Sequence, residues 1–400
     1  MKKAYTIFKN IALSFMFFAM LACVLSYFAP FFRFQEDEDV TERLNAFYNQ
    51  EKNTCDIVYL GTSATHCGIL PLYIYDNYDI TAINYAISGL PAETFEIAID
   101  EILKYQTPKV ICIELREYIR YAHNFTTGGE PLSERKQKLR RQYLSGLVNS
   151  LPASSTINRF KLVNKFAPAV LEEDEKLIDW QFEYLKTHKN WKDMGIKHMY
   201  EYLKNTLSGS VELNGFNKDY KIEEYKGTSR VTSIKENDTP DMSGFTESLP
   251  IEGEYLEILD GLVSKAKELE KQGINVLFYT IPYPDQDKPD RAPYELFVGE
   301  YLKEKGMDFV SGCFNTEKIG IEYDMDYADH TGHNNIRGAK KVTDYFTKYL
   351  IENYDLKPTK LNKSQKEDWD TATKKWKKDE LIPSEEYYAK KEAKREKANQ

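Results

Sequence analysis

Strand-like and helix-like segments alternate along two stretches of the chain, and this alternation limits the possible folds more than any other feature. In the first stretch, helical segments separate the short apolar runs CDIVYLG (55–61), TAINYAIS (81–88) and KVICIEL (109–115). Strands joined by helices in this way form βαβ units, whose strands pair in parallel. KVICIEL is apolar throughout, as expected of a strand covered on both faces. The pattern predicts a three-layer α/β fold, in which helices cover both faces of a parallel sheet.

The α/β pattern stops near residue 120 and resumes near residue 250. There, an amphipathic helix ended by Gly273 leads into the apolar run INVLFYTIPY, and a further helix, a short strand and a final helix follow. Helix-like segments fill the interruption, and the last part of the chain is dominated by Lys, Glu and Asp, so we expect it to lie outside the core. The expected parts are an α/β domain in two pieces (34–120 and 250–355), a helical insertion (121–249) and a charged tail (356–400).

Residues 1–33 have the pattern of a membrane anchor. Basic residues at positions 2, 3 and 9 precede a stretch from Ile11 to Phe32 that carries no charge. At about 1.5 Å per residue it spans about 33 Å, enough for a hydrocarbon core of about 30 Å. A cleaved signal peptide has a shorter apolar region and a small-residue cleavage site. Basic residues before the stretch and acidic residues after it predict a single-pass cell-membrane protein with a cytoplasmic N-terminus and an extracytoplasmic body.

Composition excludes some classes of protein and makes others improbable. The net charge of −9 argues against nucleic-acid binding, which requires a basic surface. The five cysteines lack CxxC and zinc-site spacing, and their odd number argues against a disulfide framework, so we expect buried thiols. We expect neither a cofactor nor a metal ion.

Two segments contain the residue types that acyl chemistry requires. The first strand runs into Gly61-Thr62-Ser63, where the glycine would allow a tight turn that presents the serine at the start of a helix. Near the last helix, His333 follows the carboxylates of Asp326 and Asp329. A neutral imidazole can take the proton of a serine hydroxyl while a carboxylate fixes the imidazole tautomer. In a parallel sheet both segments can fall at the carboxyl edge.

This combination, a GxS turn after the first strand and an Asp/His pair before the last helix, resembles the SGNH (GDSL-like) hydrolase superfamily. The N-terminal anchor and the motifs YLGTS, INYAISG and GHNNIRGAKKVTDY are more narrowly similar to its membrane-anchored, DltD-like members. The resemblance covers roughly residues 1–120 and 250–350. It implies an SGNH-like (flavodoxin-like) fold and a membrane-bound O-acyltransferase (MBOAT) as partner.

The resemblance also implies roles for individual residues. Ser63 would be the nucleophile, His333 the general base and Asp329 the acid that orients it. The backbone N–H groups of Ser63 and Gly89 would help to form the oxyanion hole. Asn335, two residues after His333, is expected to contribute to substrate binding.

Two departures from the family pattern leave alternatives open. The usual D-x-x-H spacing would place the acid where this chain has His330, so Asp326 remains an alternative to Asp329. No GxND block follows the third strand, where CIELREY stands instead, and the usual Asn donor is missing. Arg116 could supply a replacement cation, or could pair with Glu114 or Glu117.

Other interpretations of the histidines also remain. His330 and His333, with Asp326 or Asp329, could form a metal site. His66 stands three residues after Ser63 but has no obvious acid partner, and we expect it to form part of the wall of the site.

The resemblance implies a membrane-anchored serine acyltransferase or esterase that modifies a polymer of the Gram-positive cell envelope. Teichoic acid, as in D-alanylation, or a polysaccharide would be the substrate. An alternative is a catalytically inactive scaffold that binds the envelope polymer and the O-acyltransferase. A further alternative is a plain carboxylesterase acting on small acyl groups.

Overall fold

The computed structural model describes most of the α/β part of the chain but only short pieces of the predicted insertion. The chain divides into two compact units, Met1–Thr41 with Arg141–Lys218 and Glu42–Arg140 with Asp219–Gln400. Most of the predicted helices of the insertion lie outside the described residues. The described residues are 2–32, 43–44, 46–126, 163–164, 171, 176–178, 226, 233–240, 245–284 and 288–398.

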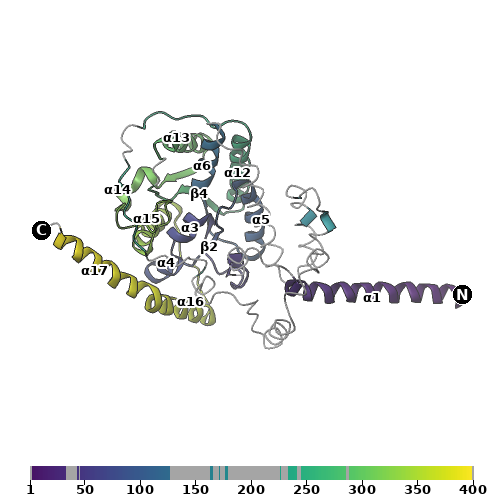
Figure 1. The fold of residues 1–400 in the computed structure, drawn as a ribbon. Helices are drawn as coiled ribbons and strands as arrows, with labels where there is room; N and C mark the ends of the chain where they lie inside the picture. The colour runs from purple at the N-terminus through teal and green to yellow at the C-terminus, as the bar shows by residue number, and fades with distance from the viewer. Residues whose placement is uncertain are drawn as a thin grey trace. The chain divides into compact units, whose positions relative to one another are not determined.

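Five strands of the second unit form one parallel sheet with the order β2-β1-β3-β4-β5. Figure 1 labels two of these strands, β2 and β4. All residues of the first three strands are buried, which explains why the sequence shows apolar runs without polar alternation. The first four strands coincide with apolar runs and β5 with the predicted short strand, so the predicted α/β fold with a parallel sheet is confirmed. The strands are β1 (Ile57–Gly61), β2 (Ala82–Ala86), β3 (Val110–Glu114), β4 (Asn275–Thr280) and β5 (Asp308–Ser311).

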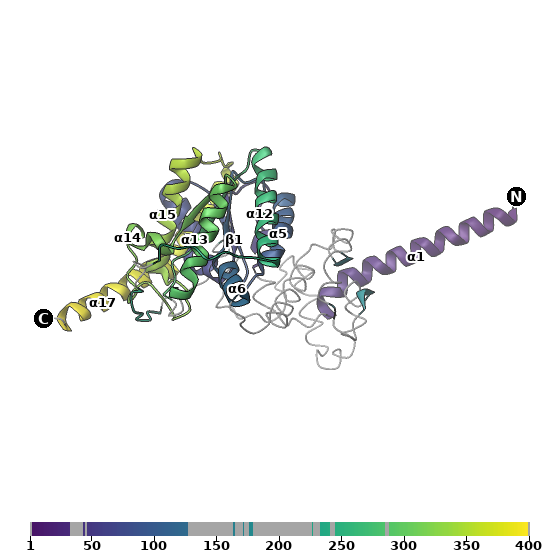
Figure 2. The ribbon, with the colours of Figure 1, turned by 90° about the horizontal axis from the view of Figure 1, so that it is seen from above.

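Helices cover both faces of this sheet (Figure 2). On one face, α5 (Phe95–Tyr105) and α12 (Glu254–Lys271) pack together. On the other, α15 (Ile336–Tyr354) packs on α3 (Ser63–Gly68) and α4 (Pro71–Tyr78), with a shared apolar core beneath them. The remaining elements are η1 (Ala92–Thr94), α6 (Arg116–Thr126), α13 (Lys288–Glu304), η5 (Cys313–Asn315) and α14 (Thr316–Ile319).

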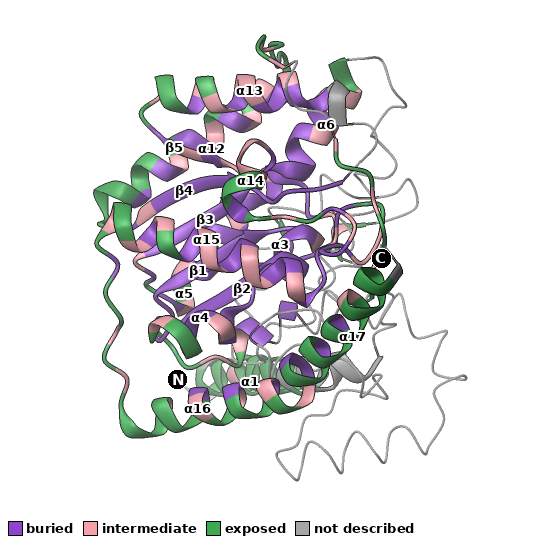
Figure 3. Cartoon of the chain, turned by 90° about the vertical axis from the view of Figure 1, so that its left-hand side faces the viewer, coloured by how far each residue is buried: buried purple, intermediate pink, exposed green. Residues whose placement is uncertain are grey.

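The charged tail is helical and has a buried face, so the expectation that it lies outside the core is wrong. It forms α16 (Lys363–Trp376), a π-helical turn (Lys377–Leu381) and α17 (Ile382–Ala398). Trp369, Trp376 and Tyr388 are buried in a second apolar cluster with residues of α4 and α15. Figure 3 shows buried positions among the exposed ones of α16 and α17. A few large aromatic residues on one side of a helix bury that side while its other faces remain charged.

The N-terminal helix α1 (Lys2–Phe32) belongs to the first unit. The described side chains of its apolar residues are largely exposed, including Phe8, Phe15 and Met16. The side chains of residues 2, 4, 22–23 and 25–32 lie outside the described part. Among the residues that the structure describes, no helix is both long and apolar enough to cross a membrane. The membrane anchor stays a prediction from the sequence.

Candidate active site

Three side chains from two distant parts of the chain form a hydrogen-bonded line at the carboxyl edge of the sheet. The Nε2 atom of His333 lies 2.8 Å from Oγ of Ser63, and its Nδ1 atom lies 2.6 Å from Oδ2 of Asp329. Ser63 follows β1, whereas Asp329 and His333 lie in the loop before α15. The structure thus brings together the three predicted residues in the arrangement of nucleophile, base and orienting carboxylate.

Close packing explains the glycine that precedes the nucleophile turn. Ser63 is the first residue of α3, as expected, and Thr62 at its N-cap is extended. A Cβ atom on Gly61 would lie 2.1 Å from Oγ1 of Thr65 and 2.8 Å from Cβ of Glu114. The φ of Gly61 is not positive, so its backbone conformation does not require glycine. The glycine therefore permits a close approach between strand ends and α3, and the expected need for a tight turn is not the reason for it.

The carboxylate of Asp329 organises the loop that carries His333. Its Oδ1 accepts hydrogen bonds from the backbone N–H groups of Thr331 at 2.9 Å, Gly332 at 3.0 Å and His333 at 3.2 Å. Gly332 has a φ of 97°, which favours glycine. Burial alone would raise the pKa of Asp329, but the hydrogen bonds and charge of His333 outweigh it and hold that pKa well below its usual range. Asp329 is therefore ionised.

The alternative acid, Asp326, has a different function. It is fully buried, pairs with Arg337, and lies 2.8 Å from Nζ of Lys341. Its Oδ2 also accepts the backbone N–H of Glu322 at 2.7 Å. These contacts hold the first turns of α15 against the preceding loop. Asp329, and not Asp326, contacts the imidazole of His333.

The prediction that Asn335 contributes to substrate binding is wrong. Asn335 is fully buried at the N-cap of α15, where its side chain accepts a hydrogen bond from the N–H of Gly338. Its Nδ2 donates to the carbonyls of Met325 at 2.7 Å and of Ser233 at 3.1 Å. With its donors and acceptor engaged by the backbone, the amide stabilises the loop and the helix start.

Gly89 lies beside the nucleophile turn. Its φ of 66° is left-handed, and the turn around it is closed by the N–H of Leu90, which donates to the carbonyl of Ile87. The N–H of Ile87 in turn donates to the carbonyl of Gly61 at 3.1 Å. This placement is compatible with the predicted oxyanion role of Gly89 together with the N–H of Ser63.

The guanidinium of Arg116 contacts the loop of the general base. Its Nη1 donates to the carbonyl of Gly332 at 2.9 Å, and its Nη2 lies 3.7 Å from Oε1 of Glu117. The group also lies over the ring of Tyr283, 5.4 Å from its centroid. Glu114 accepts the backbone N–H of Arg116 and does not pair with its guanidinium. These contacts favour the predicted pairing with Glu117 over a role as replacement oxyanion cation.

The other two histidines near the site have separate surroundings. His66 is buried, and its Nε2 lies 3.2 Å from Oγ of Ser88. Burial lowers the pKa of His66 well below the usual range, and the charges of Arg43 and His333 lower it further. A buried neutral imidazole fits the predicted wall residue. His330 is exposed, and its Nδ1 lies 2.6 Å from Oδ1 of Asn237.

Among the described residues, no cluster of three or more His, Cys, Asp and Glu side chains could hold a metal ion. Cys55, Cys67, Cys112 and Cys313 are free and buried.

One contribution to the site comes from residues 233–240, which the sequence did not indicate. The N–H of Lys235 donates to the carbonyl of Tyr327 at 2.8 Å, and Nδ2 of Asn237 donates to the carbonyl of Asp329 at 3.2 Å. Asn237 also lines a cavity of about 1140 Å³ together with residues 313–318 and 321–324. The segment is polar and lacks helical or strand periodicity, so no local signal predicts its contact with the triad loop.

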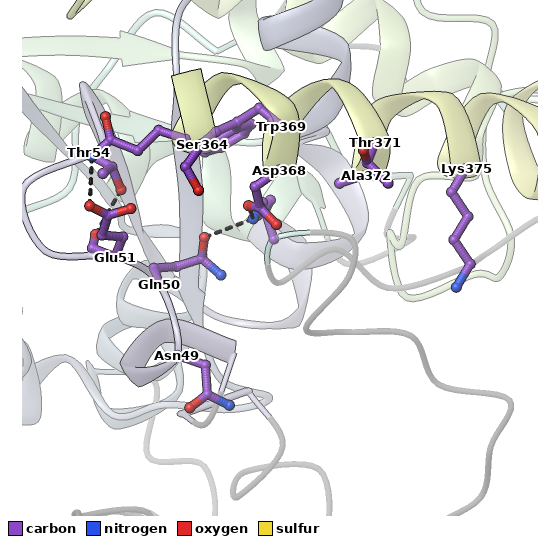
Figure 4. A pocket seen from close by; sticks show the side chains of 12 residues that line it. Asn49, Gln50, Glu51, Thr54, Ser364, Asp368, Trp369, Thr371, Ala372 and Lys375 are labelled. Carbon is purple, nitrogen blue, oxygen red and sulfur yellow. Dashed lines mark hydrogen bonds and ion pairs between the residues drawn. The ribbon is translucent and has the colours of Figure 1, made fainter. Parts of the chain in front are cut away.

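A second cavity, of about 590 Å³, has no triad residue in its lining. Figure 4 shows the side chains that line it. It is bounded by residues just before β1, such as Gln50 and Thr54, and by α16. The Nζ atom of Lys226 donates to Oε1 of Gln50 and to Oδ2 of Asp368, both at 2.9 Å, and lies over the ring of Trp369. Because Ser63 follows β1 and Thr54 precedes it, this cavity belongs to the opposite edge of the sheet.

Comparisons with known proteins add no relative: no protein-family model, no curated protein and no solved structure matches the chain.

Proposed function

We propose that the chain is a serine acyltransferase or esterase. The observation that carries the proposal is the continuous line from Ser63 through His333 to Asp329, with heavy-atom distances of 2.8 and 2.6 Å. Both distances lie within hydrogen-bond reach, which proton transfer from the hydroxyl to the imidazole requires. Ser63 and His333 are only partly buried, so a substrate can approach them.

The geometry supports a two-step reaction through an acyl-enzyme. Nε2 of His333 takes the hydroxyl proton as Oγ of Ser63 attacks the ester carbonyl, and the imidazolium then gives this proton to the leaving alkoxide as the C–O bond breaks. In the second step His333 takes a proton from an acceptor hydroxyl or from water. The new oxygen attacks the acyl carbon, and Ser63 leaves as the reprotonated hydroxyl. Ionised Asp329 stabilises the imidazolium in both steps.

The N–H groups of Ser63 and Gly89 are the proposed donors to the oxyanion. A donor placed where negative charge develops lowers the barrier by about 3 kcal/mol. Among the described contacts, neither N–H donates to another protein group. No Asn follows β3, so the proposed hole has backbone donors alone.

We place the enzyme at the outer face of the cell membrane, anchored by α1, with an envelope polymer as acceptor and an MBOAT protein as the source of the acyl group. The support is the charge-free stretch from Ile11 to Phe32, the exposed apolar side chains of α1 and the DltD-like motifs. Asn237, which donates to the backbone carbonyl of Asp329, also lines the cavity of about 1140 Å³, and we propose this cavity as the place where a bulky acceptor binds.

The proposal is tested with the purified full chain and an aryl acetate ester. Release of the aryl alcohol should require Ser63, and addition of a glycan or polyol-phosphate acceptor should divert the acetyl group to it. Ser63→Ala should abolish both. Rapid hydrolysis that no acceptor diverts would indicate the plain carboxylesterase, and full acyl transfer by Ser63→Ala would contradict the mechanism. A folded wild-type chain that neither hydrolyses nor transfers would favour the scaffold.

A further inference from the structure

The carboxyl end of β3 contacts both of the loops that carry the triad. Glu114 is the last residue of β3, and Arg116 is the first residue of α6. Both side chains are buried, with exposed fractions of 1% and 6%. Charged groups are seldom buried to this extent unless specific partners compensate them. One partner of each residue lies on a loop of the triad: Thr62 for Glu114 and Gly332 for Arg116.

Glu114 holds the loop of the nucleophile. Its Oε2 accepts the hydroxyl of Thr62 at 3.3 Å, and its Oε1 accepts the backbone N–H of Arg116 at 2.7 Å. Thr62 is the residue directly before Ser63, and its hydroxyl makes no capping bond within α3. The missing side chain of Gly61 leaves the space into which Cβ of Glu114 packs.

Arg116 holds the loop of the base in a parallel way. Its Nη1 donates to the carbonyl of Gly332, the residue directly before His333. A Cβ atom on Gly332 would lie 2.8 Å from that Nη1 and 2.6 Å from Cβ of Tyr283. Each catalytic loop therefore contains a glycine close to its catalytic residue. Gly61 leaves room for the side chain of Glu114, and Gly332 leaves room for that of Arg116.

We propose that Glu114 and Arg116 are positioning residues that set the distance between Ser63 and His333. The proposal rests on the proposed function, because it concerns the reactivity of the same serine. Ser63 and His333 lie 270 positions apart and contact each other through one hydrogen bond of 2.8 Å. Fixing both loops to two residues at the junction of β3 and α6, only two positions apart, limits their relative movement. A displacement of about 1 Å between reacting groups costs about 100-fold in rate.

The electrostatics of Glu114 agree with this role. Burial raises its pKa to about 7, and the neighbouring charge of Arg116 counteracts part of that shift. The other titratable groups that interact with Glu114 are Glu117, on α6, and Tyr279, on β4. The hydrogen bonds from the backbone of Arg116 and from the side chain of Thr62 also counteract the shift, so both contacts stabilise the buried carboxylate.

The first test compares rates of Ser63 labelling by a fluorophosphonate in the full chain. Arg116→Met should lower the rate constant about 10- to 100-fold, and Arg116→Lys, which keeps a donor for Gly332, should recover part of it. Arg120→Met is the matched control, because Arg120 lies on the same helix and pairs with the same Glu117 but makes no described contact with either loop. Its rate should stay within about twofold of wild type.

Glu114 is tested by the same measurement. Glu114→Gln can still accept the N–H of Arg116 and contact the hydroxyl of Thr62, so its labelling rate should stay near wild type. Glu114→Ala loses both contacts and should slow labelling about 10-fold or more. Equal rates for the Ala variant and wild type, in folded protein, would overturn the role of Glu114.

A spectroscopic readout separates this proposal from the proposed function. The proton between Nδ1 of His333 and Asp329 should give a resonance downfield of the amide region, assigned by its loss in His333→Gln. Arg116→Met should shift or remove it, and Arg120→Met should preserve it. If wild type is not labelled but the resonance responds in this way, the proposed function fails and the positioning role stands. A resonance and a labelling rate that Arg116→Met leaves unchanged would overturn the positioning role, as would absence of the resonance from wild type.

Discussion

The two loops that meet at the triad are built in different ways. The nucleophile turn lies directly on the sheet: Thr62 is fully buried, and the missing side chain of Gly61 allows α3 and β3 to pack closely. The loop of the base is more exposed, and a single carboxylate, Asp329, holds it through three backbone N–H groups. The core therefore determines the position of Ser63, whereas a few polar contacts determine that of His333. Substitutions in the second loop should separate activity from stability.

The largest expected effect is that of Asp329→Asn. The amide cannot stabilise the imidazolium as the carboxylate does, and it favours the wrong tautomer of His333, so turnover of an aryl ester should fall by about 10⁴-fold. The free energy of unfolding should change little, because Oδ1 of the amide can still accept the three backbone N–H groups of the loop.

Asp326→Asn is the matched control for that variant and should have the opposite profile. It removes the carboxylate that Arg337 and Lys341 share in the core, and should lower the free energy of unfolding by about 3 kcal/mol. Turnover per folded molecule should stay near wild type. Loss of turnover equal to that of Asp329→Asn would show that the two carboxylates are not distinct in function.

The next effect concerns the pH dependence of stability and involves Glu114, which packs against the buried nucleophile turn. Between its ordinary pKa of 4.5 and about 7, Glu114 keeps its proton in the folded protein and loses it in the unfolded chain. Its contribution to the free energy of unfolding therefore falls as the pH rises through this window, by about 3 kcal/mol in total. Denaturant unfolding of Glu114→Gln between pH 4 and pH 8 should show a flatter profile than wild type. Parallel profiles would mean that Glu114 is ionised in the folded state.

The smallest effect is expected for Asn335→Ala. Loss of the cap of α15 and of the hydrogen bonds to the loop should lower the free energy of unfolding by about 2 kcal/mol. The Michaelis constant for an aryl ester should not change, because Asn335 is fully buried. An increase in the Michaelis constant of about 10-fold or more, without loss of stability, would restore the substrate-binding role predicted from the sequence.

The nucleophile turn could be predicted from the sequence better than the loop of the base. Apolar runs indicate buried parallel strands, and Gly61-Thr62-Ser63 follows such a run, so the sheet and the place of Ser63 were predictable. The choice between Asp329 and Asp326 was not. It depends on Arg337 and Lys341, whose side chains reach Asp326 only because the first turns of α15 pack beside it.

Three other features depend on contacts between distant parts of the chain. Asn335 follows His333 as a substrate-binding residue would, yet it points into the protein and bonds to Ser233, about 100 positions away. Charge dominates the composition of the tail, and the burial of Trp369 and Trp376 is set by α4 and α15. The contact of Arg116 with Gly332 joins residues 216 positions apart. No local pattern indicates such pairings.

The most direct test of the central claim, an activated Ser63, is fluorophosphonate labelling of the full chain in membranes, with the adduct located by mass spectrometry. The account predicts one adduct, on Ser63, which is absent from Ser63→Ala and at least about 100-fold slower to form in His333→Ala. An unlabelled wild type, or labelling of Ser63 at the same rate without His333, would contradict it.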